Sequence, residues 1–159
     1  MELESVDIDL FLQRCIEVQL LKQIYEEFSK HIGKDKTLKI LQQVIDKTAI
    51  EQGKCMAADF GGNTTRHLAA ALKTFTIGGA NELDPLELTE EKFSFNVTKC
   101  KYADLYKELG LEDLGLILSC NRDFAFAKGF NPELELIRTK TILEGADYCD
   151  FRYKIKKKE

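Results

Sequence analysis

The segment CNRDFAFAKGFNPELELIRTKTILEGADYCDFRY, residues 120–153, contains the pattern that decides the fold. Its run LELI at 134–137, and the run CDFRYKI that starts at Cys149, alternate between apolar and polar side chains. Such alternation is typical of strands with one buried face. The Asn131-Pro132 pair before the first run marks a turn. The segment therefore predicts two short strands near the carboxyl end of the chain.

A third run with the same period, FSFNV, precedes this segment. It places Phe93, Phe95 and Val97 on one face of a strand. Between this run and Cys120, the stretch YADLYKELGLEDLGLILSC predicts one or two short helices. The second half of the chain thus predicts a small, mostly antiparallel sheet accompanied by short helices.

The first half of the chain has a helical period instead. From Ile8 to Ile32, apolar residues recur at helical spacing, which predicts one long amphipathic helix that ends at Gly33. The apolar stripe consists of Leu12, Ile16, Leu20, Ile24 and Phe28, widened by Cys15 and Leu21. Packing in the core of the domain explains this stripe, and so does packing on a second copy of the chain. A homodimer is therefore an open alternative.

Two further helices are predicted before residue 80. One runs over about 36–53 and follows the first helix after a few polar residues, which favours an antiparallel hairpin. Its inward residues are predicted to be Leu38, Leu41, Ile45 and Ala49. Asn63 or Thr64 can cap the next helix, which passes through Phe75 and ends at Gly78-Gly79.

The predicted fold class is α+β, with an N-terminal helical hairpin and further helices packed on a small, mostly antiparallel sheet. At 159 residues the chain is long enough for one domain with its own core, residues 1–159. The helical part is predicted at about 6–80, and the mixed sheet and short helices at about 86–156.

The composition argues against several classes of protein. Hydrophobic residues make up 44% and charged residues 31% of the chain, as in an ordinary globular protein. The net charge of −4 argues against a nucleic-acid binder, and no apolar stretch reaches the roughly 20 residues of a membrane span. The acidic start MELESVDIDL lacks the features of a signal peptide. We therefore predict a cytoplasmic protein with neither nucleic acid nor membrane as its partner, and we interpret the five cysteines as reduced thiols.

Cys120 begins the group of residues with the strongest chemical signal. Arg122 follows it with a cation that can lower a thiol pKa, and Asp123 brings a carboxylate that can orient a base or a water molecule. We predict that Cys120 and Asp123 lie in one loop, and that the chain reverses at 129–132. The aromatic pair at 124 and 126 can form the wall of a small-ligand pocket. A cysteine that serves only for packing is the alternative.

Two later residues combine apolar surroundings with reactive groups. Cys149 shares a strand face with aromatic side chains, so we predict that it faces the core. Arg138 ends a strand face that otherwise holds leucines, so its guanidinium is predicted to be buried and to need an anion. A substrate carboxylate is one candidate for this anion, and Asp123 or Asp147 is another.

A metal site is the remaining option. No pair of Cys or His has the close spacing of a zinc finger. Four scattered residues can still converge in the fold as zinc ligands: Cys100, Cys120, Cys149 and His67. His67 is also a candidate general base, with a surface role as the alternative, whereas His31 is predicted to be structural at a helix end. No cofactor is certain from the sequence, and zinc is left open.

The order of these residues also resembles a known family. The order is Cys100-x-Tyr102, Gly110, Cys120-x-x-Asp123, the turn at 129–132, and RTKTILEGADYCDFRY. Over about residues 90–155 it resembles the L-2-amino-thiazoline-4-carboxylic acid hydrolase family. The final segment is similar to vinyl-reductase-like small-molecule-binding domains and to vesicle-tethering subunits. This wider resemblance supports helices packed on an antiparallel sheet, but a shared fold carries many functions.

The resemblance implies a hydrolase that opens a cyclic amidine, converting 2-amino-thiazoline-4-carboxylate into N-carbamoyl-cysteine. Cys120, or a water molecule held by Asp123, is then expected to attack the ring carbon between nitrogen and sulfur. The expected substrate-binding residues are Arg138, Thr139, Phe124 and Tyr148, with Arg138 clamping the carboxylate. Cys149 or Cys100 is expected to be a metal ligand or an accessory thiol.

A second hypothesis comes from another class of protein. The same cysteines can line the pocket of a non-catalytic sensor that binds a small molecule or a metal ion. General bases are scarce in the sequence, which favours the sensor, because acid–base chemistry would have to rely on perturbed carboxylates or thiols. The polarity around Cys120 favours the enzyme. In both hypotheses the partner is a small molecule.

Overall fold

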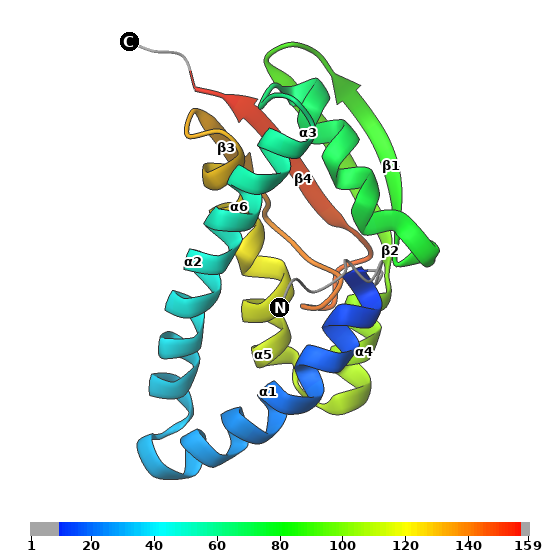
Figure 1. The fold of residues 1–159 in the computed structure, drawn as a ribbon. Helices are drawn as coiled ribbons and strands as arrows, with labels where there is room; N and C mark the ends of the chain where they lie inside the picture. The colour runs from blue at the N-terminus through cyan, green and yellow to red at the C-terminus, as the bar shows by residue number, and fades with distance from the viewer. Residues whose placement is uncertain (1–9, 157–159) are drawn as a thin grey trace.

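The computed structural model describes residues 10–156, whose arrangement is shown in Figure 1. The predicted helix start at Ile8 and the amino-terminal segment 1–9 lie outside the described residues, as does the end of the chain at 157–159. The first two helices are α1 (Leu10–Ile32) and α2 (Lys34–Asp59). They meet at Gly33, whose φ of 86° favours glycine. The predicted helical hairpin is therefore confirmed.

The apolar stripe predicted to pack α1 faces solvent in the described structure. Its five members, Leu12, Ile16, Leu20, Ile24 and Phe28, are all exposed, Leu20 to 62%. The core instead receives Val18, which is fully buried, with Leu21 and Tyr25 packed beside it. The cause is geometric. With 3.6 residues per turn, steps of four drift around the helix, whereas alternating steps of three and four keep the core-facing residues on one side.

The predicted inward face of α2 and the predicted start and end of the next helix are confirmed, but α2 continues beyond its predicted end near Gly53 to Asp59. Ala49 is buried, and the other predicted inward residues of α2 pack against the core. α3 (Thr65–Leu72) begins after Thr64, whose side chain accepts a hydrogen bond from the His67 backbone N–H at 3.4 Å. A 3-10 segment, η1 (Lys73–Gly79), continues α3 to the predicted glycine pair.

The sheet contains one strand more than the sequence predicted. Its strands are β1 (Asn81–Leu88), β2 (Lys92–Cys100), β3 (Leu134–Ile137) and β4 (Cys149–Ile155), in the order β1-β2-β4-β3 with every pair antiparallel. β1 was missed because it contains Pro85 and several acidic residues. Proline is tolerated on an edge strand, and β1 lies at the edge with an irregular register between Pro85 and Glu87.

Helices connect β2 to β3. They are α4 (Lys101–Leu109), α5 (Glu112–Gly115), a π-helical turn η2 (Leu116–Asn121) and α6 (Arg122–Phe130). The prediction that Cys120 and Asp123 share a loop is therefore wrong, because Cys120 lies in η2 and Asp123 lies in the first turn of α6. Buried residues from Ala125 to Phe130 give α6 its apolar face, which the polar residues before them concealed.

Two glycines bring α2 and α6 into close contact, as Figure 1 shows for the two helices. A Cβ on Gly129 would collide with the backbone carbonyl of Ile50 in α2. A Cβ on Gly53 would collide with the backbone of Phe126 in α6. Gly129 was expected at a chain reversal and Gly53 at a helix end, but both lie inside helices, where small residues allow the backbones to approach.

The predicted α+β class is confirmed, and the core consists of two clusters. The first cluster lies between the sheet and helices α2, α3 and α6, and includes Phe95, Phe126 and Tyr153. The second joins α1 to α4 and η2 and includes Val18, Tyr106 and Leu118. Cys100 packs against both clusters. The end of β2 is therefore the place where the two clusters meet.

Candidate functional site

A cavity of about 540 Å³ is lined by residues of both core clusters. Its walls are mostly apolar and include Phe95 and Val97 of β2, Phe126 of α6, and Tyr153 of β4. A volume between 300 and 1,000 Å³ is typical of small-molecule sites. Polar side chains from α1, α2 and α6 also line it, as does Asn81 of β1. The cavity therefore has the composition of a ligand site.

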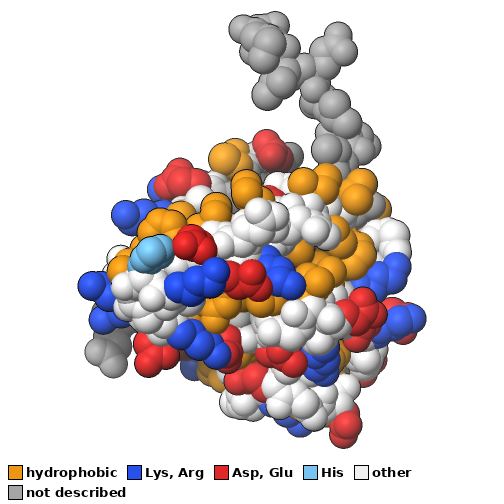
Figure 2. Space-filling view, turned by 90° about the horizontal axis from the view of Figure 1, so that it is seen from below, with side chains coloured by type: hydrophobic (Ala, Val, Ile, Leu, Met, Phe, Trp, Pro, Cys, Tyr) orange, Lys and Arg blue, Asp and Glu red, His pale blue; other side chains and the backbone are white. Residues whose placement is uncertain are grey.

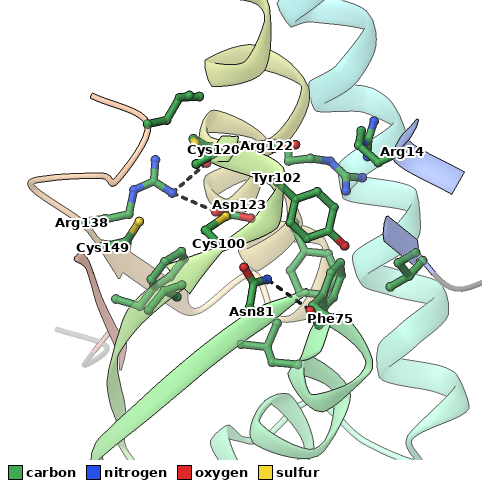
Figure 3. A pocket seen from close by; sticks show the side chains of 18 of the residues that line it. Arg14, Phe75, Asn81, Cys100, Tyr102, Cys120, Arg122, Asp123, Arg138 and Cys149 are labelled. Carbon is green, nitrogen blue, oxygen red and sulfur yellow. Dashed lines mark hydrogen bonds and ion pairs between the residues drawn. The ribbon is translucent and has the colours of Figure 1, made fainter. Parts of the chain in front are cut away.

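Arg138 and Asp123 form an ion pair in the cavity wall, shown in Figure 3. Arg138 Nη1 donates to Asp123 Oδ2 at 2.8 Å and to the Cys120 backbone oxygen at 2.8 Å. Only 4% of the Arg138 side chain is exposed, because the rings of Phe124 and Phe151 cover the guanidinium. Of the anions that the sequence left open for Arg138, the structure provides Asp123.

Asp123 has the chemical properties of a general base. Burial raises the pKa of its carboxyl group to about 6, although the charges of Arg138 and Arg122 act to lower it. A base with a pKa near the working pH combines a large ionised fraction with useful basicity. Oδ2 is held by Arg138, while Oδ1 accepts no hydrogen bond from the rest of residues 10–156. The carboxylate is thus fixed and can still accept a proton.

Three thiols surround this ion pair. Cys100, Cys120 and Cys149 all line the cavity, and Figure 3 shows them around Asp123 and Arg138. Burial raises the thiol pKa to about 11 for Cys100 and also raises that of Cys120, on which the Asp123 charge acts in the same direction. Cys149 is buried, as predicted, and its Sγ accepts a hydrogen bond from the Ile142 backbone N–H at 3.2 Å. All three thiols are therefore held in the protonated form at neutral pH.

A second polar group lines the cavity beside α1 and α2, and sequence reasoning missed most of it. Arg14 pairs with Glu17 at 2.6 Å, and Arg122 Nη2 donates to Gln52 Oε1 at 2.6 Å. Arg122 was considered only as a neighbour of Cys120, and Arg14 was not singled out. The sequence contained one indication that Arg14 faces inward. Arg14 lies four residues before the buried Val18 and so shares the core-facing side of α1 with it.

Four of the predicted site residues do not line the cavity. Phe124 packs on Arg138 from outside it, and Tyr148 lies under the Lys140 ammonium group, 3.8 Å from its ring centre. The Thr139 backbone and hydroxyl groups donate to Asp150 at 2.9 and 2.7 Å. His67 lies at the start of α3, where Nδ1 is 2.7 Å from the Thr64 hydroxyl oxygen. The cavity therefore brings together Cys100, Cys120, Asp123, Arg138 and Cys149.

The zinc alternative concerns the three thiols and His67. Within residues 10–156, no group of three or more His, Cys, Asp or Glu side chains has an arrangement that could hold a metal ion. His67 is in α3 and outside the cavity, away from the cysteines that line it. Zinc binding at this site remains an untested prediction.

The fold and the cavity together define an α+β domain with an internal cavity lined by apolar and charged side chains. The chain belongs to the L-2-amino-thiazoline-4-carboxylic acid hydrolase family, whose sequence model matches residues 13–153. The resemblance found in the sequence is thereby confirmed. A search of curated proteins gave no match.

Solved structures share the fold. The phenol-responsive sensory domain of the transcription activator PoxR, crystallised with phenol, is 10% identical with a TM-score of 0.56, over 86% of this chain and 73% of that one. A trafficking protein particle complex subunit 3 from Naegleria fowleri, covalently bound to palmitic acid, is 15% identical with a TM-score of 0.52, over 89% of this chain and 96% of that one. No helix in the part of the chain that the structure describes is both long and apolar enough to cross a membrane.

Proposed function

We propose that this protein is a hydrolase that opens the ring of a small cyclic amidine carboxylate, of the 2-amino-thiazoline-4-carboxylate type, inside the cavity. One observation supports this most strongly. A chain of this family has an aspartate, Asp123, with its pKa raised to about 6 in the wall of a cavity of about 540 Å³. A carboxylate in such an environment is suited to activate water.

The proposed reaction adds one water molecule. Asp123 removes a proton from water as the water oxygen bonds to the ring carbon between nitrogen and sulfur, and delivers that proton to the ring nitrogen. The new hydroxyl group then loses its proton to the sulfur as a carbonyl forms and the carbon–sulfur bond breaks. The two protons of water end on nitrogen and sulfur, and the product is of the N-carbamoyl-cysteine type.

Water attack is favoured over attack by Cys120 because of the electrostatics of the thiol. Burial and the neighbouring carboxylate of Asp123 raise the Cys120 pKa, so its thiolate is scarce at neutral pH. In this proposal Arg138 positions Asp123, and Cys100, Cys120 and Cys149 shape the cavity around the ring. The substrate-clamping role that the family resemblance implied for Arg138 is therefore not part of this proposal, because its guanidinium already binds the Asp123 carboxylate.

A direct assay tests the proposal. Purified protein is incubated with 2-amino-thiazoline-4-carboxylate, and the release of free thiol is followed together with the mass of the product. The proposal predicts a product that is one water heavier and carries one new thiol. Asp123→Asn is expected to lower turnover about 100-fold or more, as loss of a general base does. Glu133→Gln, a change in an exposed carboxylate outside the cavity, serves as the control.

The second candidate function is a non-catalytic small-molecule sensor. The apolar cavity walls and the raised thiol pKa values favour it, as does the fold shared with a phenol-responsive sensory domain and a palmitic-acid-bound subunit. Stoichiometric binding of the thiazoline without any product, in protein that is fully folded, would favour this candidate over the hydrolase.

The exposed apolar face of α1 supports self-association as a further part of the proposal. Ile16, Leu20, Ile24 and Phe28 are exposed on α1, and Ile40 and Val44 are exposed on α2. Figure 2 views the molecule from below, toward the end where these helices join, and shows apolar side chains among charged ones. Several large apolar side chains exposed on neighbouring helices are a feature of protein interaction sites. We propose that a second copy covers it, and that the protein is located in the cytoplasm with its five cysteines reduced.

A further inference from the structure

Arg122 is a cation in the cavity wall whose partner in the structure is neutral. Its Nη2 donates to the amide oxygen of Gln52, and its Nε is buried without a hydrogen-bond partner among residues 10–156. Within the same residues no carboxylate lies within ion-pair distance of Arg122. Arg14 and Arg138 differ, since each pairs with a carboxylate. A buried guanidinium without an anion is costly.

The charges of the cavity lining are also unequal. The charged residues that line it are three arginines and two acidic residues: Arg14, Arg122, Arg138, Glu17 and Asp123. With all five ionised, the described lining carries one net positive charge. Burial lowers the pKa of Arg122, and the like charge of Arg14 acts in the same direction. The cavity therefore lacks one negative charge beside Arg122.

We propose that Arg122, supported by Arg14, binds the carboxylate of a small monoanionic ligand. The buried Nε is available as a donor to that carboxylate, and a guanidinium edge with two N–H groups matches a carboxylate in a bidentate pair. Arg138 is the less suitable receptor because Asp123 and the Cys120 carbonyl already accept from its Nη1.

The position of Arg122 also orients the ligand. Arg122 and Asp123 are consecutive residues in the first turn of α6, and both line the cavity. A carboxylate held at Arg122 leaves the rest of a small ring compound next to Asp123 and against the apolar walls at Phe95 and Phe126. This inference deepens the proposed function, on which it rests for the choice of a small ring carboxylate as the ligand.

Calorimetric binding to two probe pairs tests the inference without turnover. The first pair is thiazolidine-4-carboxylate and its carboxamide, which have the ring but no amidine to hydrolyse, and the second is benzoate and benzamide. We expect each carboxylate to bind at least about 10-fold more tightly than its amide, from the gain of a charge-assisted bond. Arg122→Gln is expected to abolish this preference, whereas the surface control Arg66→Gln is expected to keep it.

Thermal unfolding of the ligand-free variants separates a receptor from a structural arginine. Because Arg122 lacks an anionic partner, Arg122→Gln is expected to unfold at the same temperature as the wild type or at a higher one. A clear drop in the unfolding temperature of Arg122→Gln would assign Arg122 a structural role and contradict the inference. Equal binding of acid and amide, or no binding of either carboxylate, would also contradict it, even if ring opening is observed. If the protein prefers the carboxylates but does not open the thiazoline ring, the inference about Arg122 is supported and the proposed hydrolase activity is refuted.

Discussion

Arg138 Nη1 lies 2.8 Å from Asp123 Oδ2 and joins the end of β3 to the start of α6. The same nitrogen donates to the backbone oxygen of Cys120, so one guanidinium fixes both the carboxylate and the turn before it. This ion pair sets the position of the group that we propose as the general base. It also connects two segments that are 15 residues apart in the chain.

The first prediction concerns the stability of this pair. Arg138→Met leaves the Asp123 carboxylate without its cation in a mostly apolar wall, so we expect a loss of about 2 kcal/mol in the free energy of unfolding. Asp123→Asn in the same background should recover part of that loss, because the uncompensated charge is gone. Urea denaturation of the two single variants and the double variant measures the coupling. Additive effects of the two changes would show that the pair does not stabilise the fold.

The second prediction concerns the pH dependence of stability. Burial raises the Asp123 pKa from 3.8 to about 6, so between these values the folded state binds more protons than the unfolded state. The contribution of Asp123 to stability is therefore fully present below pH 3.8 and is lost as the pH rises through 6. We expect the stability of the wild type, relative to Asp123→Asn, to fall between about pH 4 and 6 and then to become constant. If the difference in the free energy of unfolding between the wild type and Asp123→Asn were the same at every pH, the raised pKa of Asp123 would be contradicted.

The third prediction concerns the contact between α2 and α6. Gly129→Ala places a methyl group against the Ile50 carbonyl, so the helices must separate, at an expected cost of about 2 kcal/mol or more. Lys128→Ala, at the exposed neighbouring position of α6, should change stability by less than about 0.5 kcal/mol. Thermal or urea unfolding compares the two variants. Equal stabilities would mean that the helices do not approach as closely as the structure shows.

The fourth prediction concerns self-association. Leu20→Glu places a charge in the exposed apolar face of α1 and should convert a dimer into a monomer, because burying an unpaired carboxylate is unfavourable. Ile77→Glu changes an equally prominent apolar residue outside α1 and α2 and should leave the dimer intact. Sedimentation velocity measures both. If the wild-type protein sediments as a monomer at all concentrations, the proposed homodimer is wrong.

The sequence predicted the elements with regular periodicity and missed those with mixed signals. Strands β2, β3 and β4 alternate clearly, whereas β1 contains a proline that only its edge position tolerates. The polar residues at 121–123 concealed the start of α6, because an apolar face that begins three residues later is weak evidence in a single sequence. The exposed stripe of α1 has good helical spacing, and periodicity alone does not show which face a neighbouring element covers.

The sequence predicted the part of the candidate site that the carboxyl half of the chain contributes. Cys120, Asp123, Arg138 and Cys149 line one cavity, as their shared signals of polarity and burial suggested. Arg14 and Gln52 reach the same cavity from helices that are more than 60 residues earlier, and only the tertiary fold brings them there. Phe124 and Thr139 are the sequence neighbours of Asp123 and Arg138, but neither lines the cavity. Phe124 packs on the Arg138 guanidinium, and the Thr139 hydroxyl group donates to Asp150.

The most direct test of the central claim is the pH profile of thiazoline ring opening. With Asp123 as the base, kcat/KM should rise with pH to a plateau with a midpoint near the Asp123 pKa of about 6. Cys120→Ala should retain this profile, and Asp123→Asn should lose turnover by about 100-fold or more while remaining folded. Wild-type turnover in folded Asp123→Asn, or its loss in Cys120→Ala alone, would contradict the claim that Asp123 activates water.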